Sequence, residues 1–362
     1  MKRYTGLFER IATPANVLEA FYEARKGKRY RREADRFHAR LEENVLELSE
    51  ELQSGAYRPS GYRSFHVHEP KTRLVSAAPF RDRVVHHAIC RVVEPIFETK
   101  FIHDTYACRV GKGQHRALDR FTYFARRHAW VMKLDVRKFF PSVDIEKVKE
   151  LVSRTLVDTS LMALLGRILD SGSKVWAGCP EPVWFPGDGL WTPIERACGL
   201  PIGNLTSQLL ANVYLSPLDH YVKRELHCQA YLRYMDDLVF FADSRATLVG
   251  WRREVLRFLE GWRLRVHPSK CYLGRVEQGT PYLGFRVFPG HRLVLGAGVR
   301  RATRRLGRLG ERYARGEAGV SQVRQCVAGW RGHVKHADSF GLRESVLRKL
   351  VFTRPAAEAL PS

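Results

Sequence analysis

The chain of 362 residues lacks several features that would assign it to a common class of protein. Its seven cysteines are odd in number and form no Cys-x-x-Cys pair, which argues against a zinc ribbon and against a secreted disulfide framework. No apolar run is long enough to cross a membrane, and the first residues lack the apolar stretch of a signal peptide. We therefore expect a cytoplasmic protein with no membrane partner.

Acidic residues are also scarce, because 38 acidic side chains face 61 basic ones and the formal net charge is +23. Apolar residues make up 44% of the chain, so the protein is globular and not a disordered tail. The basic residues are spread along the whole length, which favours an extended track for a phosphate backbone. The alternative is a solvated basic surface with no polyanionic partner.

The apolar pattern predicts an α+β protein in which helices alternate with a few antiparallel strands, without internal repeats. Helical spacing predicts helices over 15–54, 81–97, 145–169, 207–226, 250–263 and 293–362, the last broken near Gly316 and Gly332. A period-two pattern predicts an antiparallel pair over 62–75 with its turn at 70–73. A short apolar run predicts a strand at 131–134, an apolar segment with two acids in its middle predicts a hairpin at 231–241, and a further strand is predicted at 281–288. Residues 170–199 are rich in Gly, Pro and Trp and are expected to form a loop insertion.

Two adjacent acids, Asp236 and Asp237, lie in the middle of the apolar segment 231–241. Burying two carboxylates without a partner is costly, but a hairpin tip would place them at the end of a sheet. A divalent cation would compensate their charge, since Mg²⁺ prefers a few carboxylates together with water and phosphate oxygens. The alternative is an ordinary polar turn.

A second acid, Asp135, ends the apolar strand 131–134. Two strands that each deliver a carboxylate to one sheet edge are what a two-metal phosphoryl-transfer site requires. One ion would activate an attacking 3′-hydroxyl and the other would neutralise the leaving pyrophosphate. The alternative is that Asp135 caps a following helix.

The order of these segments resembles that of bacterial reverse transcriptases. The Asp-x-x-x-Phe-Phe segment at Asp135, the Gly-x-x-x-Ser segment at Gly203 and the x-x-x-Asp-Asp hairpin ending at Asp237 occur in the family's order, within a resemblance that covers about 40 to 345. The resemblance implies a right-hand polymerase with fingers, an antiparallel palm and a helical thumb. It implies two Mg²⁺ ions, with Mn²⁺ as an alternative, held by Asp135, Val136, Asp236 and Asp237.

The family also implies residues that contact the incoming nucleotide. Phe140 matches the aromatic residue that selects deoxynucleotides, although Phe139 would serve equally well if the ring were a core residue. Gly203 and Gln208 lie in the segment that opens the palm helix, whose common form is Gln-Gly-x-x-x-Ser-Pro; here Ile202 replaces the Gln and Gln208 the Pro. This departure is similar to the polymerases of diversity-generating retroelements, which copy RNA with frequent errors at adenines.

Further matches concern the triphosphate, the leaving group and the strands. Lys71 and Arg73 resemble the fingers hairpin that grips the triphosphate, or form a solvated basic tip, and Lys270 matches the lysine implied to protonate pyrophosphate, with a plain surface lysine as the alternative. The remaining matches imply contacts with primer or template and comprise Arg109, Lys112, Tyr282, Leu283, Gly284, Arg301 and Arg305. The plain alternatives are a core strand around Gly284 and a solvated helix face, although no acid interrupts 293–310.

These matches predict a division into an N-terminal helical extension (1–60), fingers (61–130), palm (131–290, with the insertion 170–199), thumb (291–352) and tail (353–362). Three tryptophans in the insertion, Trp176, Trp184 and Trp191, would cover a groove, stack on nucleic acid or face a partner. We expect no endonuclease or ribonuclease H domain.

We therefore expect an RNA-directed DNA polymerase, first of the diversity-generating type. Its partners would be an RNA template, a DNA or RNA primer, deoxynucleoside triphosphates and a small basic accessory protein. A defence-associated or group II intron-like reverse transcriptase is the alternative enzyme. An RNA-binding protein on an inactive polymerase scaffold is the alternative from another class.

Overall fold

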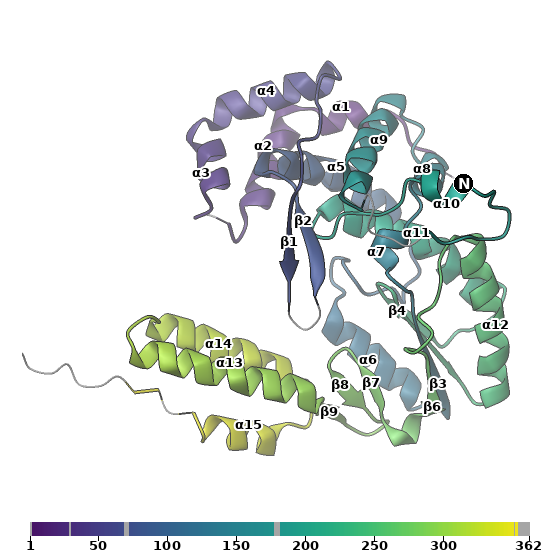
Figure 1. Ribbon diagram of the computed structural model, residues 1–362, viewed down its shortest axis with the longest axis vertical. Helices are drawn as coiled ribbons and strands as arrows, with labels where there is room; N and C mark the ends of the chain where they lie inside the picture. Colours follow the sequence, from purple (N-terminus) through teal and green to yellow (C-terminus); the bar gives the residue numbers. More distant parts are fainter. Residues whose placement is uncertain (1, 29, 69–71, 177–181, 351, 354–362) are drawn as a thin grey trace, which may run out of the picture. The chain divides into compact units, whose positions relative to one another are not determined.

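A computed structural model describes residues 2–28, 30–68, 72–176, 182–350, 352 and 353. The chain forms two compact units (Figure 1). The first comprises Met1–Gly111, Lys133–Leu238 and Val249–Cys271, and the second Lys112–Met132, Val239–Leu248 and Tyr272–Ser362. The predicted division into extension, fingers, palm, thumb and tail follows other boundaries and stays a prediction.

The N-terminal part of the first unit is a helical layer. Thr13 accepts a hydrogen bond from the backbone N–H of Asn16 and Pro14 follows it, so the first long helix starts where its free N–H groups are capped. Phe21 is buried and its ring centroid lies 5.4 Å from that of Phe37 and 6.0 Å from that of Phe80. The helices are α1 (Leu7–Ile11), α2 (Pro14–Arg25), α3 (Arg32–Ala39), α4 (Leu41–Gln53) and α5 (Phe80–Glu98). The helices predicted in 15–54 and 81–97 are confirmed.

The predicted strand pair over 62–75 is confirmed as an antiparallel hairpin of β1 (Arg63–Val67) and β2 (Arg73–Ala77), with Phe65 opposite Val75. Every residue of β1 is exposed. The predicted turn includes Pro70 and Lys71, which lie outside the described residues.

A four-stranded sheet carries the acids singled out in the sequence, in the order β4-β5-β3-β6. The strand that ends at Asp135 and the hairpin over 231–241 are both confirmed. Helix α11 (Leu205–Arg224) packs against β4 and also against α5 and α8 (Ile145–Ser153). The strands are β3 (Trp130–Asp135), β4 (Tyr231–Tyr234), β5 (Asp237–Ala242) and β6 (Tyr272–Arg275).

The helical prediction over 145–169 holds with one interruption. Asp144 and Asp158 each cap a helix by accepting a backbone N–H, so α8 ends and α9 (Thr159–Ser173) starts anew. Because α9 runs on to Ser173 and the 3₁₀ helix η1 (Lys174–Trp176) follows it, the irregular insertion starts later than the predicted residue 170. Its described part contains the short helix α10 (Thr192–Glu195).

The single strand predicted over 281–288 is wrong. The chain turns at Leu283 and Gly284, whose φ angles are 43° and 88°, and Tyr282 pairs with Phe285. A three-stranded sheet results, in the order β7 (Thr280–Tyr282), β8 (Phe285–Val287) and β9 (Arg292–Val294). Helix α6 (Gln114–Ala125) contacts β8 within this second unit. Helix α12 (Arg245–Gly261) begins earlier than the predicted residue 250.

The C-terminal helices of the second unit are α13 (Gly296–Ala314), α14 (Val320–Val334) and α15 (Phe340–Leu347) (Figure 1). The predicted break near Gly316 is confirmed, and φ of 77° there explains the glycine. The predicted break near Gly332 is also confirmed, although α14 continues through Gly332 and ends two residues later, at Val334. A glycine inside a helix costs only about 1 kcal/mol, which packing offsets.

Cys90 and Cys228 are buried, Cys108 is exposed, and no disulfide joins the cysteines of the described residues. Across those same residues, no helix is both long enough and apolar enough to span a bilayer.

Candidate active site

The tip of the β4–β5 hairpin and the end of β3 meet through their backbones. Met235, with φ of 56°, and Asp236 form the turn between the two strands. The N–H of Val136 donates to the carbonyl of Asp236 over 3.1 Å. Asp135, Asp236 and Asp237 therefore come together at one sheet edge, from two segments a hundred residues apart in the chain.

The electrostatics of this edge show that the three carboxyl groups affect one another. Burial, opposed by Lys133 and assisted by the charges of Asp236 and Asp135, raises the pKa of Asp237 to about 6. Burial likewise raises the pKa of Asp236, Asp135 adds to the shift, and Arg73 and Lys270 oppose it. The site is thus an edge of mutually repelling carboxylates that favours nearby cations.

Two lysines partly supply that charge. The ammonium group of Lys270 pairs with Asp135, and Lys133 Nζ lies 3.5 Å from Asp237 Oδ2. Within the part of the chain that the structure describes, no three His, Cys, Asp or Glu side chains are gathered as they would be around one ion. The donor chemistry nevertheless fits Mg²⁺, which prefers carboxylate oxygens and would relieve the repulsion that raises these pKa values.

A buried ion pair lies directly beneath the hairpin. Arg233 and Asp219 are both 0% exposed, and the guanidinium binds both carboxylate oxygens, with Nε 2.8 Å from Oδ1 and Nη2 2.7 Å from Oδ2. Arg233 Nη1 also donates to the carbonyl of Met235 over 3.0 Å. The pair therefore holds the backbone of the residue that precedes Asp236.

The groups around this pair satisfy its remaining hydrogen-bonding capacity. Tyr231 donates its hydroxyl to Asp219 over 2.8 Å, and the Asn212 side chain accepts from Arg233 over 3.0 Å. The backbone of Arg233 accepts from the N–H of Tyr106 and donates to the carbonyl of Asp104, which extends the sheet edge. Sequence analysis missed this layer. The available signal was an arginine inside an apolar strand together with an aspartate inside an apolar helix.

Arg109 lies in the same part of the fold, and its placement goes against the predicted template contact. Its guanidinium is 6% exposed, pairs with Glu98 over 2.7 Å and donates to the carbonyls of Ile102 and Thr105. The side chain therefore stabilises the segment that runs beside Arg233, and is not available to a strand of nucleic acid.

The residues predicted near the nucleotide are only partly placed. Lys71 lies outside the described residues, whereas Arg73 is close enough to Asp236 to lower its pKa. Of the two neighbouring rings in α7 (Phe139–Ser142), Phe139 is 2% exposed, while Phe140 is only partly buried. Phe140 is therefore the ring with a free surface.

The segment that opens α11 packs on the fingers-type hairpin. The carbonyl of Ile202 accepts from the N–H of Ser76 over 2.9 Å. Gly203 has φ of 120°, and a Cβ there would lie 3.3 Å from Val75, so this position requires glycine. Gln208 lies in the first turn of α11 and is partly buried. The residue before Gly203, in the segment that leads into α11, thus carries the apolar side chain of Ile202 and not a polar amide.

The residues predicted to contact primer or template in the second unit fall into two places. Tyr282 is buried, while Leu283 and Gly284 form the β7–β8 turn, where Gln114 donates to the carbonyl of Leu283 over 2.7 Å. Lys112 precedes α6. A basic face on α13 is exposed, and no carboxylate of the described residues pairs with it; it comprises Arg300, Arg301, Arg304, Arg305 and Arg308. The roles of all these residues stay predictions.

Comparison with known proteins agrees with this geometry. Protein YkfC of Escherichia coli K12 is 26% identical over 289 residues, covering 69% of this chain and 72% of its own length. The group II intron-encoded protein LtrA of Lactococcus lactis is 23% identical over 184 residues, covering 50% and 28%. Nuclear intron maturase 1 of Arabidopsis thaliana is 27% identical over 190 residues, covering 41% and 26%. The chain thus matches only about a quarter of the intron proteins' length.

Among solved structures, apo telomerase from Candida tropicalis has a TM-score of 0.46 and 9% identity, covering 80% of this chain and 59% of that one. The sequence model of the family described as reverse transcriptase (RNA-dependent DNA polymerase) matches residues 66–287, well over half of the chain. This span includes the acids of the sheet edge and the segment that opens α11. The chain therefore belongs to the reverse transcriptase family, the RNA-dependent DNA polymerases of right-hand fold.

Proposed function

We propose that this protein extends a primer on an RNA template by two-metal-ion nucleotidyl transfer at Asp135, Asp236 and Asp237. The observation that carries the proposal is the hydrogen bond from Val136 to Asp236, which joins the end of β3 to the acidic hairpin tip. Two strands thereby present three carboxylates at one edge, as phosphoryl transfer with two divalent ions requires.

The chain's own residues divide the work around that edge. Asp135, Asp236, Asp237 and the carbonyl of Val136 would hold the ions, which when bound would activate the 3′-hydroxyl and neutralise the leaving group. Lys270, beside Asp135, would give a proton to the departing pyrophosphate. Arg73, near Asp236, would bind triphosphate oxygens, and the free face of Phe140 would lie against the sugar.

Primer extension on a defined RNA template tests this proposal. Asp236→Ala removes a carboxylate proposed to hold the ions and should lower kcat by at least about 10³-fold. Asp243→Ala removes an exposed acid that follows β5 and should leave the rate within twofold of the parent. An unmodified protein that binds RNA but extends no primer with Mg²⁺ or Mn²⁺ would favour the inactive RNA-binding scaffold.

The diversity-generating subtype is supported by Ile202, which replaces the polar residue common in the family. An apolar side chain cannot hydrogen-bond the nucleotide's sugar, so base selection at this point would rest on shape alone. We expect Ile202→Gln to lower misincorporation opposite template adenine several-fold when the cDNA is sequenced. Gln208 in α11 is left unchanged in this variant. An unchanged adenine error rate would remove the support for this subtype.

A group II intron-like enzyme is the second candidate, and the similarity to LtrA and to intron maturases favours it. A defence-associated enzyme would share the same chemistry. The sequenced cDNA separates them, because adenine-directed errors are expected only from the diversity-generating type. A small basic accessory protein would be found by co-purification with the native chain.

A further inference from the structure

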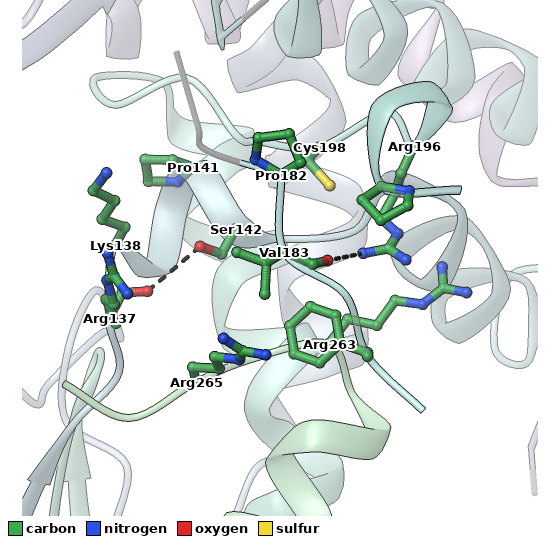
Figure 2. Close-up of a pocket in the computed structure, with 12 residues that line it drawn as sticks. Arg137, Lys138, Pro141, Ser142, Pro182, Val183, Arg196, Cys198, Arg263 and Arg265 are labelled. Carbon is green, nitrogen blue, oxygen red and sulfur yellow. Dashed lines mark hydrogen bonds between the residues drawn. The ribbon is translucent and has the colours of Figure 1, made fainter. Parts of the chain in front are cut away.

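The first unit contains a second candidate site, which is basic and lies near the edge that carries the three carboxylates. A cleft that is partly open to solvent lies between α7, the described part of the insertion and the segment after α12 (Figure 2). Five cationic side chains line it: Arg137, Lys138, Arg196, Arg263 and Arg265.

Two of these cations are neutralised by buried acids. Arg196 Nη2 lies 2.5 Å from Asp188 Oδ1, and Arg263 pairs with Asp144, so two arginines and two aspartates balance. Lys138 and Arg265 are exposed, and no carboxylate within the described residues pairs with either. The cleft therefore has an excess of positive charge at its solvent side, which only an anion can compensate.

The other wall of the cleft includes an aromatic ring. The centroid of the Phe185 ring lies 5.6 Å from the guanidinium carbon of Arg196 and 5.3 Å from that of Arg265. Arg265 also donates to the carbonyl of Trp184 over 3.0 Å, which fixes its direction. Pro182 and Pro193 line the same cleft. Such a wall suits the face of a planar base, and the free cations suit a phosphate.

The cleft shares its backbone with the catalytic strand. The N–H of Arg137 donates to the carbonyl of Arg265 over 2.7 Å, and the N–H of His267 donates to that of Asp135 over 2.7 Å. A ligand in the cleft would thus bind two residues away from a catalytic acid. Beside the cleft, the insertion also exposes Trp184 and Trp191, at 47% and 63%.

We propose that this cleft is a second nucleotide site, in which Lys138 and Arg265 bind a phosphate and the wall formed by Phe185 and the two prolines contacts the base. The ligand would be either a free nucleotide or a nucleotide within an unpaired RNA strand. Both present the same phosphate and base. The site uses none of the metal-holding acids, so the inference goes beyond the polymerase reaction and does not depend on it.

Photolabelling of the full-length protein in EDTA tests the proposal, because a nucleotide held through divalent ions is then absent from the acidic edge. The probes are 8-azido-ATP and a short unpaired RNA that contains 8-azidoadenosine. Trypsin cuts after Lys174 and Arg196, so the wall of the cleft falls within one peptide, residues 175–196. We expect at least one probe to label this peptide.

Three variants decide the outcome. Arg265→Glu should reduce labelling of the peptide about tenfold, because it puts a negative charge beside the phosphate, whereas Arg265→Lys should retain most of it. Arg253→Glu, an exposed arginine of α12 without an ion pair among the described residues, makes the same charge change and should alter labelling less than twofold.

Labelling by ATP alone identifies a free nucleotide as the ligand, and labelling by RNA alone identifies a strand. Label that falls outside residues 175–196, or that is equally strong in Arg265→Glu, overturns the proposal. Asp236→Ala should abolish primer extension and leave this labelling intact, so failure of one proposal is distinguishable from failure of the other.

Discussion

The buried layer at the β4–β5 hairpin and the basic face of α13 use arginine in opposite ways. Arg233 in the first unit has no exposed surface, and its guanidinium binds Asp219, Asn212 and the carbonyl of Met235. The arginines of α13 in the second unit are exposed, and no carboxylate of the described residues pairs with them. The guanidinium of Arg233 is bound by groups of the protein, whereas those of the α13 arginines are open to a partner molecule.

This difference predicts different consequences of mutation. Removing one member of a buried pair leaves the other charge without compensation, which is costly to both folding and local geometry. Removing an exposed arginine costs the fold little and weakens only the contact with a polyanion. The buried layer should therefore control stability and the rate of catalysis, and the α13 face should control affinity.

The largest effect is expected from Arg233→Met. The change strands the Asp219 carboxylate in the core and frees the backbone of Met235, so unfolding in urea should require about 3–5 kcal/mol less than in the parent. Primer extension should slow as well, since the hairpin tip loses its support. Arg233→Lys keeps the charge but cannot bind both carboxylate oxygens and should recover only part of either loss.

Arg257→Met is the matched control, because Arg257 pairs with Glu254 on the surface of α12. Exposed pairs of this kind contribute about 0–1 kcal/mol, so this variant should unfold almost like the parent. Similar urea midpoints for the Arg233 and Arg257 variants would refute the distinction between the two kinds of arginine.

His86 extends the comparison, because it is buried and neither of its ring nitrogens has a hydrogen-bond partner among the residues that the structure describes. Burial lowers its pKa to about 3, helped by His87 and Arg83. In the unfolded chain, His86 has the ordinary histidine pKa of about 6.5. Above this pH, the effect of His86 on the free energy of unfolding is constant. As the pH falls below it, only the unfolded chain takes up the proton, so the folded state loses stability. The two buried side chains thus differ: Arg233 is charged and paired with Asp219, whereas His86 is unpaired and neutral.

The test is the pH dependence of unfolding for His86→Leu. The difference in stability between variant and parent should grow by about 3 kcal/mol in the variant's favour between pH 7 and pH 4. Subtracting the parent's curve cancels the titration of the carboxylates. A His86→Leu curve parallel to the parent's would contradict the assignment.

The elements that local patterns define were predictable from the sequence. Two acids in the middle of an apolar segment identified the hairpin, and the apolar run before Asp135 identified β3. The Leu283–Gly284 turn was missed because three-residue strands on either side carry too few positions to show a period. The break near Gly332 was predictable, but the sequence did not show that α14 continues through this glycine to Val334, because the packing that offsets the cost of a helical glycine is not visible there.

The charged partnerships could not be predicted, because they join residues that only the fold brings together. Arg233 lies 14 residues from Asp219 and 21 from Asn212, with a turn and a helix end between them. Arg109 was assigned to the template because its charge is visible in the sequence, whereas its partner Glu98 is on another element. The α13 face was predictable because all five arginines belong to one helix and need no partner within the chain.

The smallest effect, and the one that concerns the exposed side of the comparison, is expected from the double variant Arg301→Gln, Arg305→Gln. These residues are one helical turn apart on α13 and would contact neighbouring phosphates of a template–primer duplex. Losing two such contacts should raise Kd for the duplex about tenfold at moderate salt and reduce the slope of log K against log salt by roughly 1.5. The urea midpoint should not move.

The control is Arg312→Gln, Arg348→Gln, which removes the same charge from arginines paired with Glu317 and Glu344 and should change Kd less than twofold. If both double variants lost affinity equally, the duplex would be responding to net charge alone, and the exposed arginines of α13 would have no position-specific role.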